Sequence, residues 1–181
     1  MTRRTASGSS TLASATSLGV ALGGGSGDEI GCALASPGDV DGDGLAELLI
    51  AGEGSGTAYE LRGPLSGALD LDYADTVWVV ASGPTSAADA GDLDGDGWPE
   101  RAVGDSNYNG DRGQVLLIGG ALSEGEHDET DLMARIRPSS GSDGIGWAVA
   151  GAGDLDGDGD DELLVGASDA EEAWIFLGGG M

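Results

Sequence analysis

Short apolar stretches separated by glycine-rich or acidic turns recur along the chain. Examples are TVWVVASG, GQVLLIGGALS and EAWIFLGGG, each of which ends close to glycine. Apolar runs of four to eight residues bounded by turn residues are typical of β-strands, whereas helices need longer stretches with a 3.6-residue period. The pattern therefore predicts an all-β chain of short strands.

The chain also repeats itself. The segments SPGDVDGDGLAELLIAG, ADAGDLDGDGWPERAVGD and GAGDLDGDGDDELLVGA align residue by residue. Their first aspartates, Asp39, Asp92 and Asp154, are 53 and 62 residues apart. Periods of this length indicate β-propeller blades or similar arrays and exclude leucine-rich repeats. Three tandem copies of one unit are the predicted organisation.

The similarity between the copies extends beyond the acidic segment. An apolar stretch follows it in each copy, and another precedes it, namely ATSLGVALGG, TVWVVASG and LMARIRPSS. The first and third copies add EIGCALA and GIGWAVA, so we expect four short strands in each copy. Boundaries near Leu12, Leu65 and Leu122 give a disordered N-terminal segment and three repeats: 1–11, 12–64, 65–121 and 122–181.

Composition excludes several classes of protein. With 36 glycines, 5 prolines and no tripeptide period, the chain fits neither collagen nor a helical bundle. The formal net charge of -26 argues against a nucleic-acid partner and indicates either a solvated acidic surface or carboxylates held together by cations. The apolar segments are too short for a transmembrane helix. TASGSSTLASATS after MTRR is too polar for a signal peptide.

The acidic segments carry the clearest chemistry. Each places carboxylates at positions one, three, five and nine, and glycines such as Gly42 and Gly44 supply the positive φ angles that let them converge. Calcium takes six to eight oxygen ligands in flexible geometry, and the carbonyl at position seven can add one. The predicted calcium ligands, for about three ions, are Asp39, Asp41, Asp43, Leu45, Glu47, Asp92, Asp94, Asp96, Trp98, Glu100, Asp154, Asp156, Asp158, Asp160 and Glu162.

Two other interpretations fit parts of these segments. An EF-hand loop also begins D-x-D-x-D-G, but it needs a glutamate at position twelve, where this chain has Ile50, Val103 and Val165. The residues that follow are short and β-rich instead of helical. Acidic hairpin turns without a metal are the second alternative, although turn geometry does not require four carboxylates in each of three copies.

The order of an Ile-Gly strand, GDxDGDG, an acid and a hydrophobic strand resembles the FG-GAP repeat of integrin α subunits. Ile30-Gly31 and Ile145-Gly146 stand where that family has Phe-Gly, and no equivalent precedes Asp92. The resemblance implies four-stranded antiparallel propeller blades with calcium in the loop between the first and second strands. Three such blades form only a partial propeller, a fragment or an incomplete ring, so we expect further blades or self-association to close it.

The resemblance implies a structural or ligand-interaction module, with an adhesion role, outside the cytoplasm where calcium is near millimolar. Its protein or carbohydrate ligand is not specified by the sequence. Alternatives are a lectin that stacks sugars on Trp78, Trp98, Trp147 and Trp174, and the non-catalytic propeller part of a secreted hydrolase. We expect no catalysis, because Cys32 aligns with Trp147 as a packing residue and the single histidine, His127, lies in a polar run as a loop residue.

Overall fold

The structure is a computed structural model, and the segment 1–11 expected to be disordered lies outside the residues that it describes. It describes residues 21–66, 68–80, 82–120, 124–139, 141 and 143–179. The elements, in chain order, are β1 Ala21–Gly23, β2 Ile30–Ala35, β3 Leu48–Gly52, β4 Thr57–Leu61, β5 Ala68–Asp70, the 3-10 turn η1 Leu71–Tyr73, β6 Thr76–Val79, β7 Ser86–Gly91, β8 Glu100–Asp105, the single helical turn α1 Tyr108–Asp111, β9 Gln114–Ile118, β10 Gly125–His127, β11 Ala134–Ile136, β12 Ile145–Gly153, β13 Glu162–Ala167, the 3-10 turn η2 Ser168–Ala170 and β14 Glu172–Phe176.

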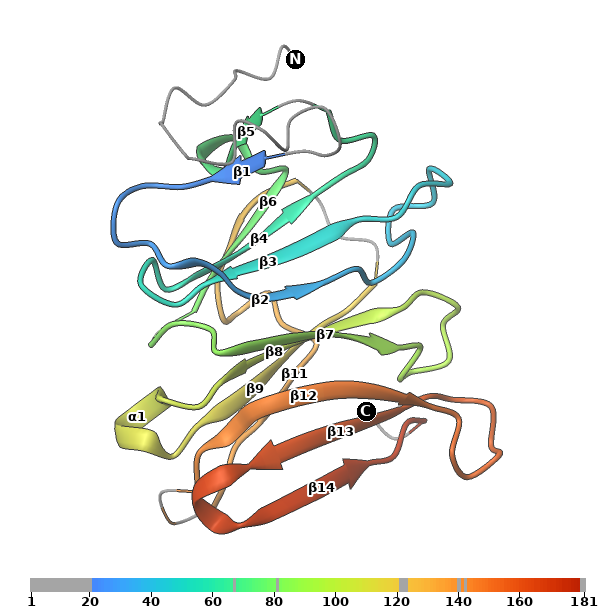
Figure 1. Cartoon of the computed structure of the whole chain (residues 1–181). Helices are drawn as coiled ribbons and strands as arrows, with labels where there is room; N and C mark the ends of the chain where they lie inside the picture. The colour runs from blue at the N-terminus through green and yellow to red at the C-terminus, as the bar shows by residue number, and fades with distance from the viewer. Residues whose placement is uncertain are drawn as a thin grey trace.

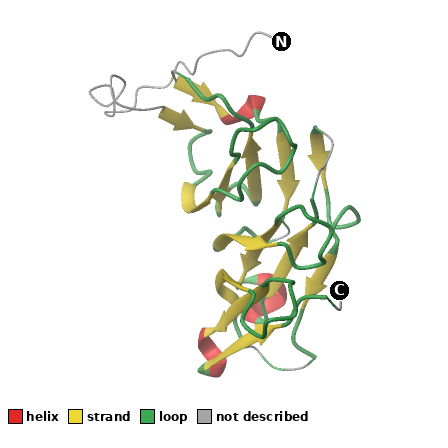
Figure 2. Ribbon diagram, turned by 90° about the vertical axis from the view of Figure 1, so that its right-hand side faces the viewer, coloured by secondary structure: helices red, strands yellow, loops and turns green. Residues whose placement is uncertain are grey.

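The strands form three main sheets that stack on one another (Figure 1). Sheet 1 has the order β10-β6-β4-β3-β2, sheet 2 the order β11-β9-β8-β7 and sheet 3 the order β12-β13-β14. A separate pair, β1 and β5, lies beyond sheet 1, and the view from the side shows the same succession (Figure 2). The prediction of a mainly β chain of small antiparallel sheets is confirmed. The described part of the chain does not close into a ring.

The prediction of three equal four-stranded antiparallel sheets is wrong in detail. Sheets 1, 2 and 3 have five, four and three strands, and two pairings, β1 with β5 and β10 with β6, are parallel. The reason is that sheets 1 and 2 take strands from later sequence units. Thus β6 pairs with β4, β10 of the third unit pairs with β6, and β11 pairs with β9. The described residues after β14 supply no such strand to sheet 3.

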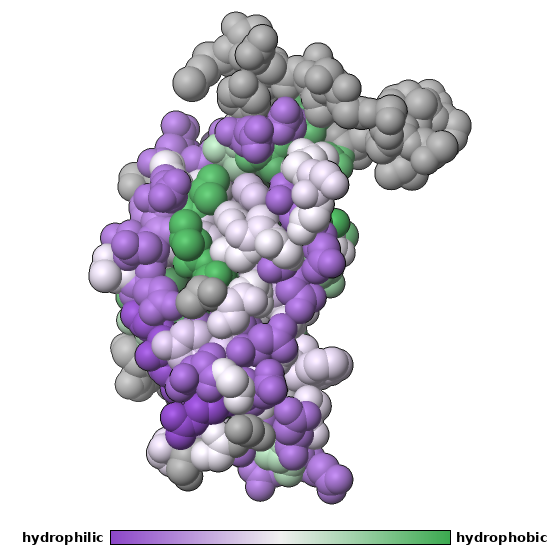
Figure 3. All heavy atoms as spheres, turned by 90° about the vertical axis from the view of Figure 1, so that its left-hand side faces the viewer, coloured by the Kyte–Doolittle hydropathy of each residue, from purple (hydrophilic) through white to green (hydrophobic). Residues whose placement is uncertain are grey.

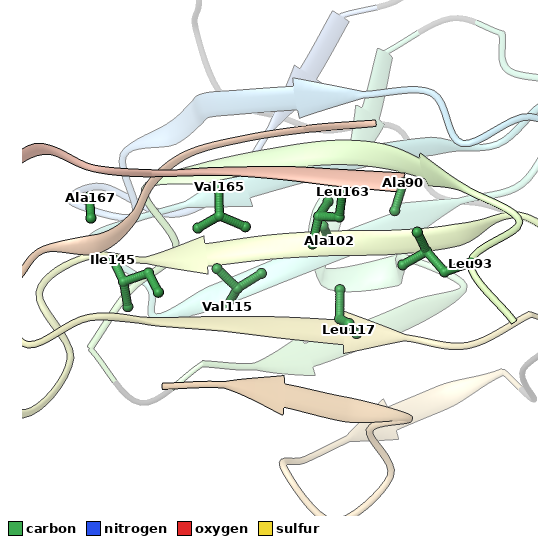
Figure 4. Packing of buried hydrophobic residues seen from close by; sticks show 9 residues of the cluster. All are labelled: Ala90, Leu93, Ala102, Val115, Leu117, Ile145, Leu163, Val165 and Ala167. Carbon is green, nitrogen blue, oxygen red and sulfur yellow. The ribbon is translucent and has the colours of Figure 1, made fainter. Parts of the chain in front are cut away.

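Burial follows the position of each sheet in the stack. Every residue of β9 in the central sheet is buried, since sheets 1 and 3 cover its two faces. The outer strand β14 instead alternates between exposed and half-buried residues. One apolar cluster lies between sheets 1 and 2 and a second between sheets 2 and 3 (Figure 4). The second consists of Ala90, Leu93, Ala102, Val115, Leu117, Ile145, Leu163, Val165 and Ala167.

The first strands of the sheets lie next to one another. Strand β7 contacts β2 on one side and β12 on the other.

On the side of the molecule shown in Figure 3, hydrophilic residues cover much of the surface and one apolar patch lies in the upper half. Exposed acidic residues also lie outside the repeated segments, for example Asp72, Glu126 and Asp169.

Gly104 marks a close approach of sheet 2 to sheet 3. A Cβ at this position would lie 2.1 Å from the carbonyl oxygen of Gly146. Gly104→Ala should therefore lower the free energy of unfolding by about 1–3 kcal/mol, as overpacking does, in urea titrations. Gly166 occupies the same position in β13, where a Cβ would meet nothing closer than 3.5 Å. Equal loss of stability in Gly104→Ala and Gly166→Ala would contradict this packing.

Candidate metal centres

The three acidic segments connect the first and second strands of sheets 1, 2 and 3. We name them loop 1 (39–47), loop 2 (92–100) and loop 3 (154–162). Loop 1 joins β2 to β3, loop 2 joins β7 to β8, and loop 3 joins β12 to β13. All three project from the same side of the stack, on the right in Figure 1. The repeated spacing in the sequence thus becomes a row of equivalent loops.

Each loop is curled by hydrogen bonds from its own backbone to its aspartates. In loop 1, Asp39 Oδ1 accepts from the amide of Gly42 at 2.7 Å and Asp39 Oδ2 accepts from Gly44 at 2.8 Å. Asp43 Oδ1 accepts from the Leu45 amide at 2.8 Å. Both glycines have positive φ, 79° and 89°, a conformation that L side chains rarely adopt. Loops 2 and 3 repeat these glycine angles and most of these bonds.

This curl brings the predicted carboxylates together in every loop. Within each group, one ligand atom per residue lies within 4.8 Å of the others. Carboxylate oxygens at such separations repel one another unless a cation lies among them. The groups are Asp39, Asp41 and Asp43 in loop 1; Asp92, Asp94 and Asp96 in loop 2; and Asp154, Asp156, Asp158 and Glu162 in loop 3.

The glutamate at position nine of each loop accepts a hydrogen bond from the amide at position two. Glu47 Oε2 accepts from the Val40 amide at 2.8 Å, Glu100 Oε2 accepts from the Leu93 amide at 2.7 Å, and Glu162 makes the same bond to Leu155. All three glutamates are buried at the start of the second strand. Only Glu162 belongs to its acidic group at the separation given above.

The other carboxylate oxygen of each glutamate has no hydrogen-bond donor among the described residues. Oε1 of Glu47, Glu100 and Glu162 is buried and accepts no hydrogen bond from the described residues. A buried oxygen without a donor costs about 1–3 kcal/mol, so natural structures rarely keep one unless an ion or water binds it. The same atom is left over at three equivalent positions, which fits a cation bound by each loop.

Burial and the neighbouring acids also disturb the titration of two glutamates. Desolvation, followed by the charges of Asp94, Asp96 and Asp92, raises the pKa of Glu100 from 4.5 to about 7. Desolvation first, and then Asp41 and Asp43, raises the pKa of Glu47 as well. Without a cation, burial and the neighbouring charges therefore disfavour the ionised form of both carboxyl groups.

Comparison with known families identifies the repeats. A family model described as an FG-GAP-like repeat matches residues 39–103, and the FG-GAP repeat model matches residues 145–176. The chain contains FG-GAP repeats. The resemblance inferred from the sequence is therefore confirmed, and the matches include the complete acidic segments of all three loops. No curated protein sequence matches the chain.

The seventh residues of the FG-GAP loops contact different parts of the protein. Leu45 packs beside Gly63, the Trp98 ring lies over Gly42 of loop 1, and Asp160 lies over loop 2. Their amides bond to the fifth-position aspartates. Ligation by the three carbonyl oxygens stays a prediction. The sequence analysis did not single out Asp161, whose Oδ2 accepts from the Asp92 amide of loop 2. The signal for it was the acid that stands in the third repeat where the second repeat has Pro99.

Most tryptophans in these FG-GAP repeats pack within the protein. Trp78 is buried and stacks on His127 with ring centroids 4.7 Å apart. Trp98 covers loop 1, and Trp174 packs against the cluster between sheets 2 and 3. Trp147 is 61% exposed. The four rings therefore do not form a common stacking surface, and packing accounts for three of them.

Cys32 and His127 differ from their expected placements. Cys32 is exposed on β2, so the expected packing role is wrong, because β2 is the edge strand of sheet 1 and none of its residues is fully buried. Its Sγ donates to the Pro84 carbonyl at 3.2 Å. His127 ends strand β10 instead of lying in a loop, since this segment pairs with β6, and its Nδ1 lies 3.4 Å from Asp131.

Proposed function

We propose that the chain is a calcium-binding, non-catalytic FG-GAP module of a partial β-propeller that works outside the cytoplasm and presents a surface to protein or carbohydrate ligands. One observation carries the calcium assignment: three loops gather acidic oxygens, and each loop keeps one buried glutamate oxygen without a donor. The row of first strands β2, β7 and β12 supports the propeller assignment, since blades place their first strands side by side.

The donor chemistry favours calcium over other common metals. Every gathered side-chain donor is a carboxylate oxygen, whereas zinc sites generally use cysteine or histidine. Magnesium demands a strict octahedron and keeps several waters, but calcium accepts six to eight oxygens in flexible geometry. The buried glutamate Oε1, the aspartates and the seventh carbonyl would supply most of such a shell. Calcium would then hold each loop rigid and cancel much of the local repulsion.

The outer face of sheet 3 supports further blades as partners. Leu164 and Ile175 are 37% and 56% exposed there, although the equivalent Ala102 and Leu117 of sheet 2 are fully buried by sheet 3. Strand β14 also pairs only with β13 among the described residues. Another sheet of the same repeat, from a second copy or from more chain, would bury this face as sheet 3 buries sheet 2.

None of the described helices is long and apolar enough to cross a membrane.

Calorimetric titration of the metal-free chain tests the calcium assignment. We expect three calcium ions per chain, one for each acidic group. Asp43→Ala, Asp96→Ala and Asp158→Ala should each remove one ion, because each loses the fifth-position carboxylate of one loop. Magnesium should bind more weakly to all three loops. Absence of binding heat at millimolar calcium, or the same stoichiometry in all variants, would refute the assignment.

A further inference from the structure

Neighbouring loops are in direct contact with each other. The seventh side chain of one loop lies over the fourth residue of the preceding loop: a Cβ on Gly42 would be 2.9 Å from the Trp98 ring, and a Cβ on Gly95 would be 2.5 Å from Asp160 Oδ1. The positive φ of Gly42 and Gly95, 79° and 74°, disfavours any other residue at position four of these junctions. They differ in chemistry, since an aromatic ring covers loop 1 and a carboxylate covers loop 2.

The junction between loops 2 and 3 contains a clamp that acts on the first ligand of loop 2. The Asp161 amide donates to the Asp92 carbonyl at 2.9 Å, and Asp161 Oδ2 accepts from the Asp92 amide at 3.0 Å. The Gly179 amide bonds to the neighbouring Leu93 carbonyl at 2.8 Å. Asp92 Oδ1 is buried without a donor among the described residues, and Oδ2 accepts from the Gly97 amide of its own loop. The backbone that carries this carboxylate is thus held from loop 3.

Among the described residues, the junction between loops 1 and 2 lacks the two bonds that Asp161 makes to Asp92. Pro99 occupies the position that Asp161 has in loop 3. Proline has neither an amide hydrogen to donate nor a side-chain acceptor, so it cannot make either bond to Asp39. The chain therefore contains one clamped and one unclamped junction between otherwise similar loops, and the second serves as an internal control for the first.

We propose that loops 2 and 3 bind their cations cooperatively through Asp161, while loop 1 binds independently. This inference rests on the proposed calcium function. A cation in loop 3 fixes the segment from Asp158 to Glu162, which includes Asp161. The clamp then holds Asp92 in its ligating position before a cation enters loop 2, so less ordering remains for the second ion. By thermodynamic reciprocity, a cation in loop 2 strengthens binding in loop 3 by the same factor.

The test is a calorimetric calcium titration in a chain from which loop 1 is removed by Asp43→Ala. Loop 2 alone is measured after adding Asp158→Ala, and loop 3 alone after adding Asp96→Ala. The product of the two association constants in Asp43→Ala should exceed the product of the single-loop constants by about fivefold or more. Asp161→Pro, which copies the residue of loop 2, should reduce this factor below about twofold.

The matched control is the pair of loops 1 and 2, measured in Asp158→Ala. Its two constants should multiply to the product of the single-loop values within about twofold. In the metal-free chain, hydrogen exchange of the Asp92 amide should be faster in Asp161→Pro than in the unaltered protein. Coupling that is absent between loops 2 and 3, or equal in both pairs, overturns this inference alone. Absence of calcium binding in every variant overturns the proposed function with it.

Discussion

Saturating calcium should raise the free energy of unfolding of the chain by about 8 kcal/mol. Each ion that binds only the folded protein adds about 2.7 kcal/mol when free calcium is 100-fold above its dissociation constant, and the chain has three acidic groups. Relief of repulsion among the gathered carboxylates is part of this gain. Urea unfolding with calcium, compared with unfolding in a chelator at equal ionic strength, measures the difference.

A triple variant separates site binding from general charge screening. Asp43→Ala/Asp96→Ala/Asp158→Ala should lose nearly all of the calcium-dependent stabilisation, because each loop loses its fifth-position carboxylate. The matched control, Asp72→Ala/Glu126→Ala/Asp169→Ala, removes the same formal charge at exposed residues outside the loops. It should keep the full calcium effect. An equal calcium response in the two triple variants would show that calcium acts by screening alone.

Removal of Arg101 should cost about 3–5 kcal/mol of stability, since it leaves a buried carboxylate without its counter-charge. Arg101 and Glu60 are 0% and 2% exposed, and Arg101 Nε lies 3.1 Å from Glu60 Oε2 across the junction of sheets 1 and 2. Arg101 also donates to the carbonyl oxygens of Gly119 and Gly120 at 2.9 Å. Burial lowers the pKa of the guanidinium, and Glu60 opposes that shift. Urea unfolding of Arg101→Leu measures the loss.

The neighbouring junction shows how this loss can be reversed. Leu117 and Leu163 occupy the equivalent positions between sheets 2 and 3, and both are fully buried in one apolar cluster. Glu60→Leu/Arg101→Leu should therefore recover most of the stability lost in Arg101→Leu, because replacing both members of a buried ion pair by apolar residues is often neutral. A double variant as unstable as the single one would mean that the two carbonyl bonds of Arg101, and not the ion pair, hold the junction.

The loops could be predicted from the sequence because their geometry is local. Aspartates at alternate positions with glycines between them determine the curl within nine residues, and the structure places Asp39, Asp41 and Asp43 together as that spacing requires. The role of the ninth residue was only partly foreseen. Glu47 uses one oxygen to bond the Val40 amide, a contact between residues seven apart that depends on where strand β3 begins.

The assignment of strands to sheets could not be predicted in the same way. Thr76–Val79 was placed with the second repeat because it precedes loop 2, but it pairs with β4 of sheet 1. Which sheet accepts a segment depends on long-range pairing, about which the alternation of apolar residues carries no information. The buried Arg101 has the same origin, since its partner Glu60 lies in a different repeat and no local pattern links the two residues.

Diffraction from crystals grown with calcium, recorded at long wavelength for anomalous scattering, would locate bound calcium ions. We expect three peaks, one in each loop, with carboxylate oxygens at about 2.3–2.6 Å. Oε1 of Glu47, Glu100 and Glu162 should turn towards or lie next to the ions, as its buried position without a donor requires. Loops that carry no anomalous peak at millimolar calcium, or peaks confined to acids outside the loops, would contradict it.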